Sequence, residues 1–179
     1  MASENKVDCS RVYVKKSLFS NAETGDFDGA FAACPIKKGR VKEFCVFSRT
    51  SRLAFSRVVR YSHHTDSSAF SFFAGDLVEK GVMRRLPEGF DGNSCTYIFT
   101  WSTERPNKTW AMGSGTSAFY NTAAEDDANT NMVRHFDEDT FEIFAARDIE
   151  KDEELLHTYI SLKWRTCFAD LNEIVHAKK

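Results

Sequence analysis

Two aromatic residues stand five positions apart near the end of the chain, directly behind a run of carboxylates. In the stretch "DEELLHTYISLKWRTCF", Tyr159 is followed by Trp164. A tyrosine hydroxyl in a pocket can both donate and accept a hydrogen bond, and the flat face of a tryptophan can stack on a planar base such as adenine. Either residue could equally belong to a hydrophobic core. The spacing alone therefore leaves a binding pair and two core aromatics as open alternatives.

A second candidate group is the pair Asn121 and Asn129 in "YNTAAEDDAN". Asparagine amides hold either loop backbone or a ligand in place, so a turn-stabilising role and a binding role are both open. His63 and His64 adjoin Asp66, but adjacent residues do not have the spacing of metal ligands on one helix face. We expect no metal site.

The chain lacks the motifs of several other chemistries. It has no G-x-S-x-G elbow, no P-loop and no H-E-x-x-H, so hydrolase, kinase and zincin functions receive no support. Its cysteines are odd in number and none lies within four residues of another, which argues against a disulfide framework or a zinc knuckle. They are Cys9, Cys34, Cys45, Cys95 and Cys167.

Composition limits the kind of molecule that positions these residues. The chain has 179 residues, 42% of them hydrophobic, which is enough for one domain with its own core. No apolar run approaches the roughly 18 residues that span a bilayer. The first residues, "MASENKVDCSRVYVKK", have no apolar signal region, so we expect a protein that is not secreted.

Charge is distributed unevenly along the chain. Residues 1–110 hold 17 Lys and Arg against 12 Asp and Glu, a balance of +5, whereas residues 111–179 hold 7 against 14, a balance of −7. An acidic closing third attracts a basic ligand and repels nucleic acid, unless it is simply a solvated face. We expect neither nucleic-acid binding nor a membrane partner.

Hydrophobic patterning predicts many short strands, long loops and one terminal helix. Because strands and helices do not alternate, a parallel sheet of the Rossmann kind is disfavoured. The predicted elements are a strand in 10–19, a turn and two short strands in 24–47, a strand at 95–101, a loop over 108–131, a strand, turn and short strand in 140–159, and a helix over 161–179.

Several stretches, taken in order, resemble the SET-domain lysine methyltransferases, particularly the small single-domain viral kind. "VYVKKSLFSNAETGDFDGAFAACPIKKG" is similar to the opening of that family, with its valine-rich strand and its glycine turn. "SAFYNTAAEDDANT" stands where the family carries "F-x-N-H-x-x-x-P-N", and "ARDIEKDEELLHTY" resembles the closing "I-x-x-G-E-E-L-x-x-x-Y".

The resemblance implies a fold and a domain layout. It implies a mainly β chain with a short C-terminal helix, in the SET (β-clip, pseudoknot) architecture, whose threaded crossing brings the Asn121 and Tyr159 segments together. The whole chain, 1–179, would be one SET domain. It would comprise an N-terminal part (1–48), a variable insert (49–96), a C-terminal part (97–160) and a C-terminal helix (161–179).

The resemblance also implies an activity, the transfer of a methyl group from S-adenosylmethionine to a protein lysine. Tyr159 would be the catalytic tyrosine. The cofactor would be held by Gly29, Ala30, Phe31, Asn121, Thr122 and Trp164, and the lysine channel would be lined by Tyr97, Phe99 and Tyr120. A basic, lysine-containing peptide or a histone tail would be the partner, the protein would be nuclear or cytoplasmic, nuclear if its substrate is a histone, and the small viral relatives suggest a homodimer.

The sequence departs from the family pattern at three places. Phe27 stands at the first glycine of the "G-x-G" turn, Thr122 replaces the histidine after Asn121, and two extra residues with Ala128 replace the "P-N" spacing before Asn129. Two alternatives stay open, the first because of these departures and the second because any Lys- and Arg-rich partner would suit an acidic surface. One is a SET-like peptide-binding module with impaired catalysis, and the other is a methyltransferase of a non-histone protein.

Overall fold

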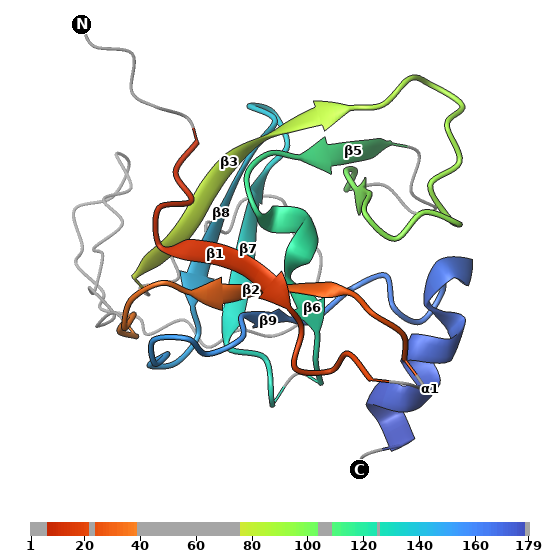
Figure 1. Ribbon diagram of the computed structural model, residues 1–179. Helices are drawn as coiled ribbons and strands as arrows, with labels where there is room; N and C mark the ends of the chain where they lie inside the picture. The colour runs from red at the N-terminus through yellow and green to blue at the C-terminus, as the bar shows by residue number, and fades with distance from the viewer. Residues whose placement is uncertain (1–6, 22–23, 39–75, 104–108, 125, 178–179) are drawn as a thin grey trace, which may run out of the picture.

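A computed structural model describes residues 7–21, 24–38, 76–103, 109–124 and 126–177. The chain is mainly β with a short C-terminal helix, as predicted (Figure 1). Its smaller sheet is the antiparallel pair β1 (Val12–Lys16) and β2 (Asp28–Ala32), in which Val14 lies opposite Ala30. The β-branched, alternating stretch favours an extended backbone, and the predicted first strand is confirmed.

Within the described residues, seven strands form the larger sheet, in the order β4-β5-β3-β8-β7-β9-β6. Antiparallel pairing joins β3 to β8 and β8 to β7, while β9 lies parallel to both β7 and β6. The strand bounds are β3 Leu77–Arg85, β4 Phe99–Thr100, β5 Trp110–Gly113, β6 Asn121–Thr122, β7 Thr130–His135, β8 Thr140–Ala145 and β9 Leu156–His157.

The predicted insert at 49–96 needs a correction in its last part. Residues 77–85 form β3, which lies inside the large sheet between β5 and β8. Its partners come from positions 26 to 67 residues further along the chain (Arg85 with Ala111, Leu77 with Phe144), so no local pattern indicated them. Residues 49–75 lie outside the described part of the structure.

The strand predicted at 95–101 is mostly wrong, since only Phe99 and Thr100 pair with β5. The physical reason is that the side chain of Arg165 binds this backbone. The guanidinium of Arg165 donates to the carbonyls of Gly92, Cys95 and Ile98, so these backbone groups are satisfied without a neighbouring strand. The stretch is held as a bent segment instead.

The crossing of two distant segments is the feature that positions the site. Strand β9 runs parallel to β6, with Asn121 beside Leu156 and Thr122 beside His157. In Figure 1 these two short strands lie together below the 3-10 helix η1 (Ser117–Phe119). The Asn121 and Tyr159 segments therefore meet, as the family resemblance implied.

The C-terminal helix is shorter than predicted. Residues 160–164 form turns, η2 (Thr166–Phe168) follows, and helix α1 spans Ala169–Ala177. Trp164 consequently lies in a turn and not on the helix. The backbone N–H of Trp164 and of Arg165 both donate to the carbonyl of Ser161, which closes the turn.

The core lies on one face of the large sheet. Strand β8 buries every second residue, Phe141, Ile143 and Ala145, as a strand does when one of its faces packs on the core. Leu155 and Ile149 pack from the segment before β9. The four cysteines among the described residues are free thiols, and Cys45 lies outside them. No helix within the described residues is long and apolar enough to cross a membrane.

Candidate active site

Tyr159 lies just after β9 and is tied to the β6 segment at two points. Its hydroxyl donates to the carbonyl of Tyr120 at 2.6 Å, and its backbone N–H donates to Oγ1 of Thr122 at 3.3 Å. Burial raises the pKa of the Tyr159 phenol well above its usual range, so the hydroxyl keeps its proton. Because that proton is committed to Tyr120, the oxygen can engage any further partner only as an acceptor.

A narrow cavity of about 40 Å³ lies against Tyr159. Its walls are mostly aromatic and aliphatic, and this volume matches roughly three water molecules. The predicted channel residues Tyr97, Phe99 and Tyr120 all line it. Its other lining residues are Thr96, Ile98, Thr100, Ser117, Ala118, Met132, Arg134, Ile143, His157, Ile160, Ser161, Arg165 and Phe168.

The predicted channel residues occupy different depths of this cavity. Tyr120 is buried, Phe99 on β4 is half-buried, and Tyr97 is exposed at the rim. The ring of Phe168 packs on that of Tyr159, with a centroid distance of 5.1 Å and the planes tilted by 47°. The structure thus brings all three predicted channel residues and the predicted catalytic residue to one cavity.

Glu79 is a residue of this site that the sequence did not indicate. Its side chain is fully buried on β3, and its carboxylate accepts from the Tyr120 hydroxyl at 2.9 Å and from the backbone N–H and hydroxyl of Thr116. Burial raises the pKa of the Glu79 carboxyl, while these hydrogen bonds act in the opposite direction. Glu79 therefore anchors the Tyr120 wall from behind.

Arg165 is a second residue that sequence reasoning missed. It is buried, and its guanidinium donates to the carbonyls of Ile98, Gly92 and Cys95. It also lies 5.1 Å from the ring centroid of Trp110 and 4.7 Å from that of Phe168. One side chain thus holds the segment that carries Tyr97 and Phe99 against the segment that carries Tyr159.

A second polar group, which we name the Glu154 cluster, lies beside the cavity. The carboxylate of Glu154 accepts from Ser17 Oγ, Leu18 N and Asn121 Nδ2, at 2.7–2.9 Å. Asn121 also donates to the carbonyl of Asp28. A Cβ added at Gly29 would overlap Oε1 of Glu154, so a larger residue here would have to displace this hydrogen-bonded carboxylate.

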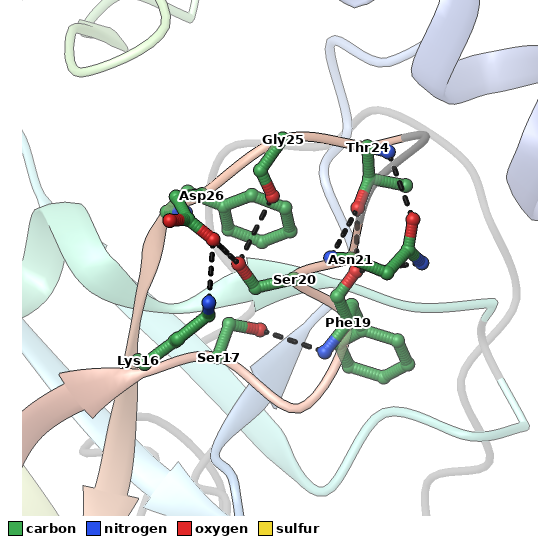
Figure 2. A network of polar contacts seen from close by, with 9 residues as sticks. Lys16, Ser17, Phe19, Ser20, Asn21, Thr24, Gly25 and Asp26 are labelled. Carbon is green, nitrogen blue, oxygen red and sulfur yellow. Dashed lines mark hydrogen bonds and ion pairs between the residues drawn. The ribbon is translucent and has the colours of Figure 1, made fainter.

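The cluster fixes the start of the β1–β2 connection, which Figure 2 shows from close by. Ser17 Oγ, which donates to Glu154, also accepts from the backbone N–H of Phe19. Further along, Lys16 pairs with Asp26, and Ser20 Oγ donates to the carbonyl of Gly25. Leu18, whose backbone N–H donates to Glu154, is 72% exposed and offers an apolar surface beside the Glu154 cluster.

The predicted cofactor residues are not all placed alike. Gly29, Asn121 and Thr122 lie together at the Glu154 cluster and β6. Ala30 and Phe31 are 0% exposed, between β1 and residues 152–155, and the Ala30 carbonyl accepts from Leu155 N. The structure gives these two residues a packing role, and neither presents surface to a ligand.

Trp164 and Asn129 lie apart from the cavity lining. The Trp164 ring is 50% exposed, and its centroid is 6.3 Å from that of Trp110. Asn129 is fully buried, with Nδ2 donating to the Glu154 carbonyl and Oδ1 accepting from Leu156 N. Of the roles left open for Asn129, the structure supports the tying of loop backbone.

Comparison with known proteins identifies the family of this chain. The family model described as SET domain matches residues 28–160. The matched stretch includes Gly29, Asn121 and Tyr159, and it ends one residue after the tyrosine. The chain belongs to the SET-domain family of protein methyltransferases.

Two further similarities are more distant. A magnesium transporter of Saccharomyces cerevisiae, ALR2, is 30% identical over 122 residues, which is 66% of this chain but only 14% of that protein. A crystal structure of a Plasmodium falciparum protein proposed to be a histone methyltransferase matches with a TM-score of 0.47 at 16% identity. That match covers 83% of this chain and 92% of the other.

Proposed function

We propose that this protein is an S-adenosylmethionine-dependent protein-lysine N-methyltransferase, with a histone tail as its substrate. The observation that supports this most is Tyr159, whose proton is committed to Tyr120 and whose ring borders a narrow aromatic cavity. An amine at the end of a lysine side chain has the shape to enter such a cavity and the N–H donors to meet an acceptor oxygen.

The residues at the Glu154 cluster have the chemistry to hold the cofactor. Asn121 is half-buried, and its Nδ2 donates to the Glu154 carboxylate and the Asp28 carbonyl. Its Oδ1 is left as an acceptor that suits the ammonium group on the amino-acid part of the cofactor. The residues that would hold the cofactor are Gly29, Asn121 and Thr122, with Trp164 over the adenine. When bound, S-adenosylmethionine supplies a methyl group carried on a sulfonium.

The chain's own residues do the rest by position. Thr122 Oγ1 holds the backbone of Tyr159, and Tyr120 holds its hydroxyl, so the acceptor oxygen has a defined place. The aromatic walls keep water from the reacting amine and align its lone pair. Tyr120 and Asn121 are neighbours in sequence, so the cavity and the Glu154 cluster adjoin, as a lysine channel and a cofactor site must.

The choice of a basic partner rests on charge. The balance of −7 over residues 111–179 attracts Lys- and Arg-rich peptides, among which histone tails are the most abundant nuclear example. A nuclear location would follow from a histone substrate, and a non-histone basic protein is the alternative substrate. We also propose a homodimer, on the family resemblance alone.

A second candidate function is a peptide-binding module without turnover. Thr122 favours it, since it stands where the family carries histidine. In that case the cavity would accept a lysine side chain, but no methyl group would be transferred.

Methyl transfer tests the proposal directly. We would incubate wild type, Tyr159→Phe and Tyr13→Phe with labelled cofactor and core histones, then with an array of lysine peptides. Tyr13 is the matched control, since its hydroxyl binds Asp152 on an exposed surface. We expect label from the wild type and the control, and at least about a hundredfold less from Tyr159→Phe, because the positioned hydroxyl is lost.

Calorimetric titration with S-adenosylmethionine separates the remaining outcomes. Cofactor binding without label on any substrate would support the module without turnover. No cofactor binding and no label from a folded wild type would refute the proposed activity.

A further inference from the structure

Arg134 on β7 has no ionic or hydrogen-bonded partner among the described residues, although it lines the cavity and is half-buried. It lies two residues after Met132, on the face of β7 that also contributes to the cavity, and opposite Phe141 on β8. Burial lowers the pKa of Arg134 from its ordinary value, and the group remains a cation.

None of the ionisable side chains that line the cavity carries a negative charge. Strand β7 contributes Arg134, and the segment after β9 contributes Arg165, whose two terminal nitrogens donate to backbone carbonyls. On β8, Glu142 pairs with His135 and is absent from the lining. On β3, Glu79 lies behind Tyr120 and is likewise absent from it. No carboxylate among the described residues faces the cavity.

His157 on β9 completes the lining and adds no charge. Its Nδ1 lies 3.3 Å from the Thr130 carbonyl, an arrangement in which the neutral ring donates there. Burial, with Arg134 as the next cause, lowers the pKa of His157 to about 4, so the ring is neutral at physiological pH and a poor proton acceptor. A substrate ammonium entering the cavity would meet neither a counter-ion nor an effective base.

We propose that Arg134 makes this cavity select the uncharged form of the substrate amine. The inference rests on the proposed function, because it concerns the lysine that the methyltransferase would bind. A guanidinium about 10 Å from an amine, at an effective dielectric constant of about 20, disfavours the ammonium form by roughly one pKa unit. The proton is released to solvent before the amine is seated, and its lone pair is then free to attack.

The pH dependence of kcat for methyl transfer at saturating peptide tests this, because kcat reports the pKa of the amine in the bound complex. We would compare wild type with Arg134→Met, which removes the charge, and Arg134→Lys, which retains it. Arg84→Met is the matched control, since Arg84 is exposed on β3. We expect the acid limb of Arg134→Met to move up by about one pH unit, with the rate lowered about tenfold at pH 7 and recovered at high pH. Arg134→Lys and Arg84→Met should keep the wild-type limb.

A structural role of Arg134 would lower the rate equally at all pH values, and an unshifted limb in a folded Arg134→Met protein would overturn the inference. Binding of N-acetyl-lysine amide, followed by NMR from pH 7 to 11, gives a readout without turnover. Wild type should bind it more tightly as the amine loses its proton. Arg134→Met should discriminate less between the ammonium and the neutral amine. Equal affinity for both forms would overturn the inference. Absence of methyl transfer with selective binding retained would count against the proposed function alone.

Discussion

The cavity beside Tyr159 and the Glu154 cluster adjoin each other, yet they are built in opposite ways. The cavity has aromatic and aliphatic walls, two guanidinium groups and no carboxylate among its lining residues. The Glu154 cluster is centred on a carboxylate that accepts from a hydroxyl, a backbone N–H and an amide. Tyr120 lines the cavity, and the next residue, Asn121, belongs to the Glu154 cluster.

The difference shows where the acidic charge near the site is used. Glu79 and Glu154 are both buried, and each accepts three hydrogen bonds that hold a loop in place. Neither carboxylate faces the cavity. Acidic residues near the site therefore shape it from behind, and the cavity itself keeps a positive character that suits a neutral amine.

On the cavity side, removal of Arg165 should cause the largest loss of stability. Arg165→Met leaves three backbone carbonyls without their donor, and we expect a loss of about 3–5 kcal/mol in the free energy of unfolding. Urea unfolding measures this loss. The control is Arg147→Met, which breaks a half-exposed ion pair with Glu153 and should cost less than about 1 kcal/mol. Equal losses would show that Arg165 is not the main tie of the cavity wall.

His157 should make the cavity side sensitive to acid. Its pKa is about 4 in the folded chain and 6.5 without the fold, so below pH 6.5 the unfolded chain binds a proton that the folded chain does not. This contribution to stability is therefore present above pH 6.5 and is lost as the pH falls towards 4. The loss amounts to about 3 kcal/mol at pH 4.

Urea unfolding of wild type and His157→Gln at pH 7, 5.5 and 4.5 checks this expectation. The stability of the variant should fall less steeply over this interval, since it lacks the titrating ring. Parallel curves for the two proteins would mean that His157 titrates normally and that the cavity is more hydrated than its lining indicates.

At the Glu154 cluster we expect a smaller loss of stability, which depends on the pair Gly29 and Glu154. Gly29→Ala should cost about 1–3 kcal/mol, because its Cβ would overlap Oε1 of Glu154. In a Glu154→Ala background that overlap is absent, so the second substitution should cost clearly less. A double-mutant cycle by thermal unfolding measures the coupling.

Asp26→Asn is the control for this cycle, since Asp26 pairs with Lys16 on the exposed part of the same connection. It should add to Gly29→Ala without coupling. Additive losses for Gly29→Ala and Glu154→Ala would contradict the close approach of the two residues.

Part of the site could be predicted because the family resemblance indicated which residues would lie together. Tyr159, Tyr97, Phe99 and Tyr120 were expected to share a channel, and they line one cavity. Periodicity predicted strands at the places of β1, β2, β8 and β9 and a final helix, although the helix begins at Ala169. The loop predicted over 108–131 was wrong in part, because it contains β5, β6 and the start of β7, which pair with strands from elsewhere in the chain. The strand predicted at 95–101 failed because Arg165, far along the chain, takes up its carbonyls.

By itself, the sequence determined the family through motifs near both ends, the strands whose residues alternate, and the identity of the tyrosine at the site. The tertiary structure alone decided that Glu79 anchors Tyr120, that Arg165 holds the cavity wall and that Arg134 lines it unpaired. Glu79 is 41 residues from Tyr120, and Arg165 is 73 from Gly92. Contacts over such separations leave no local pattern, because they depend on which segments the fold brings together, and only the folded backbone specifies that.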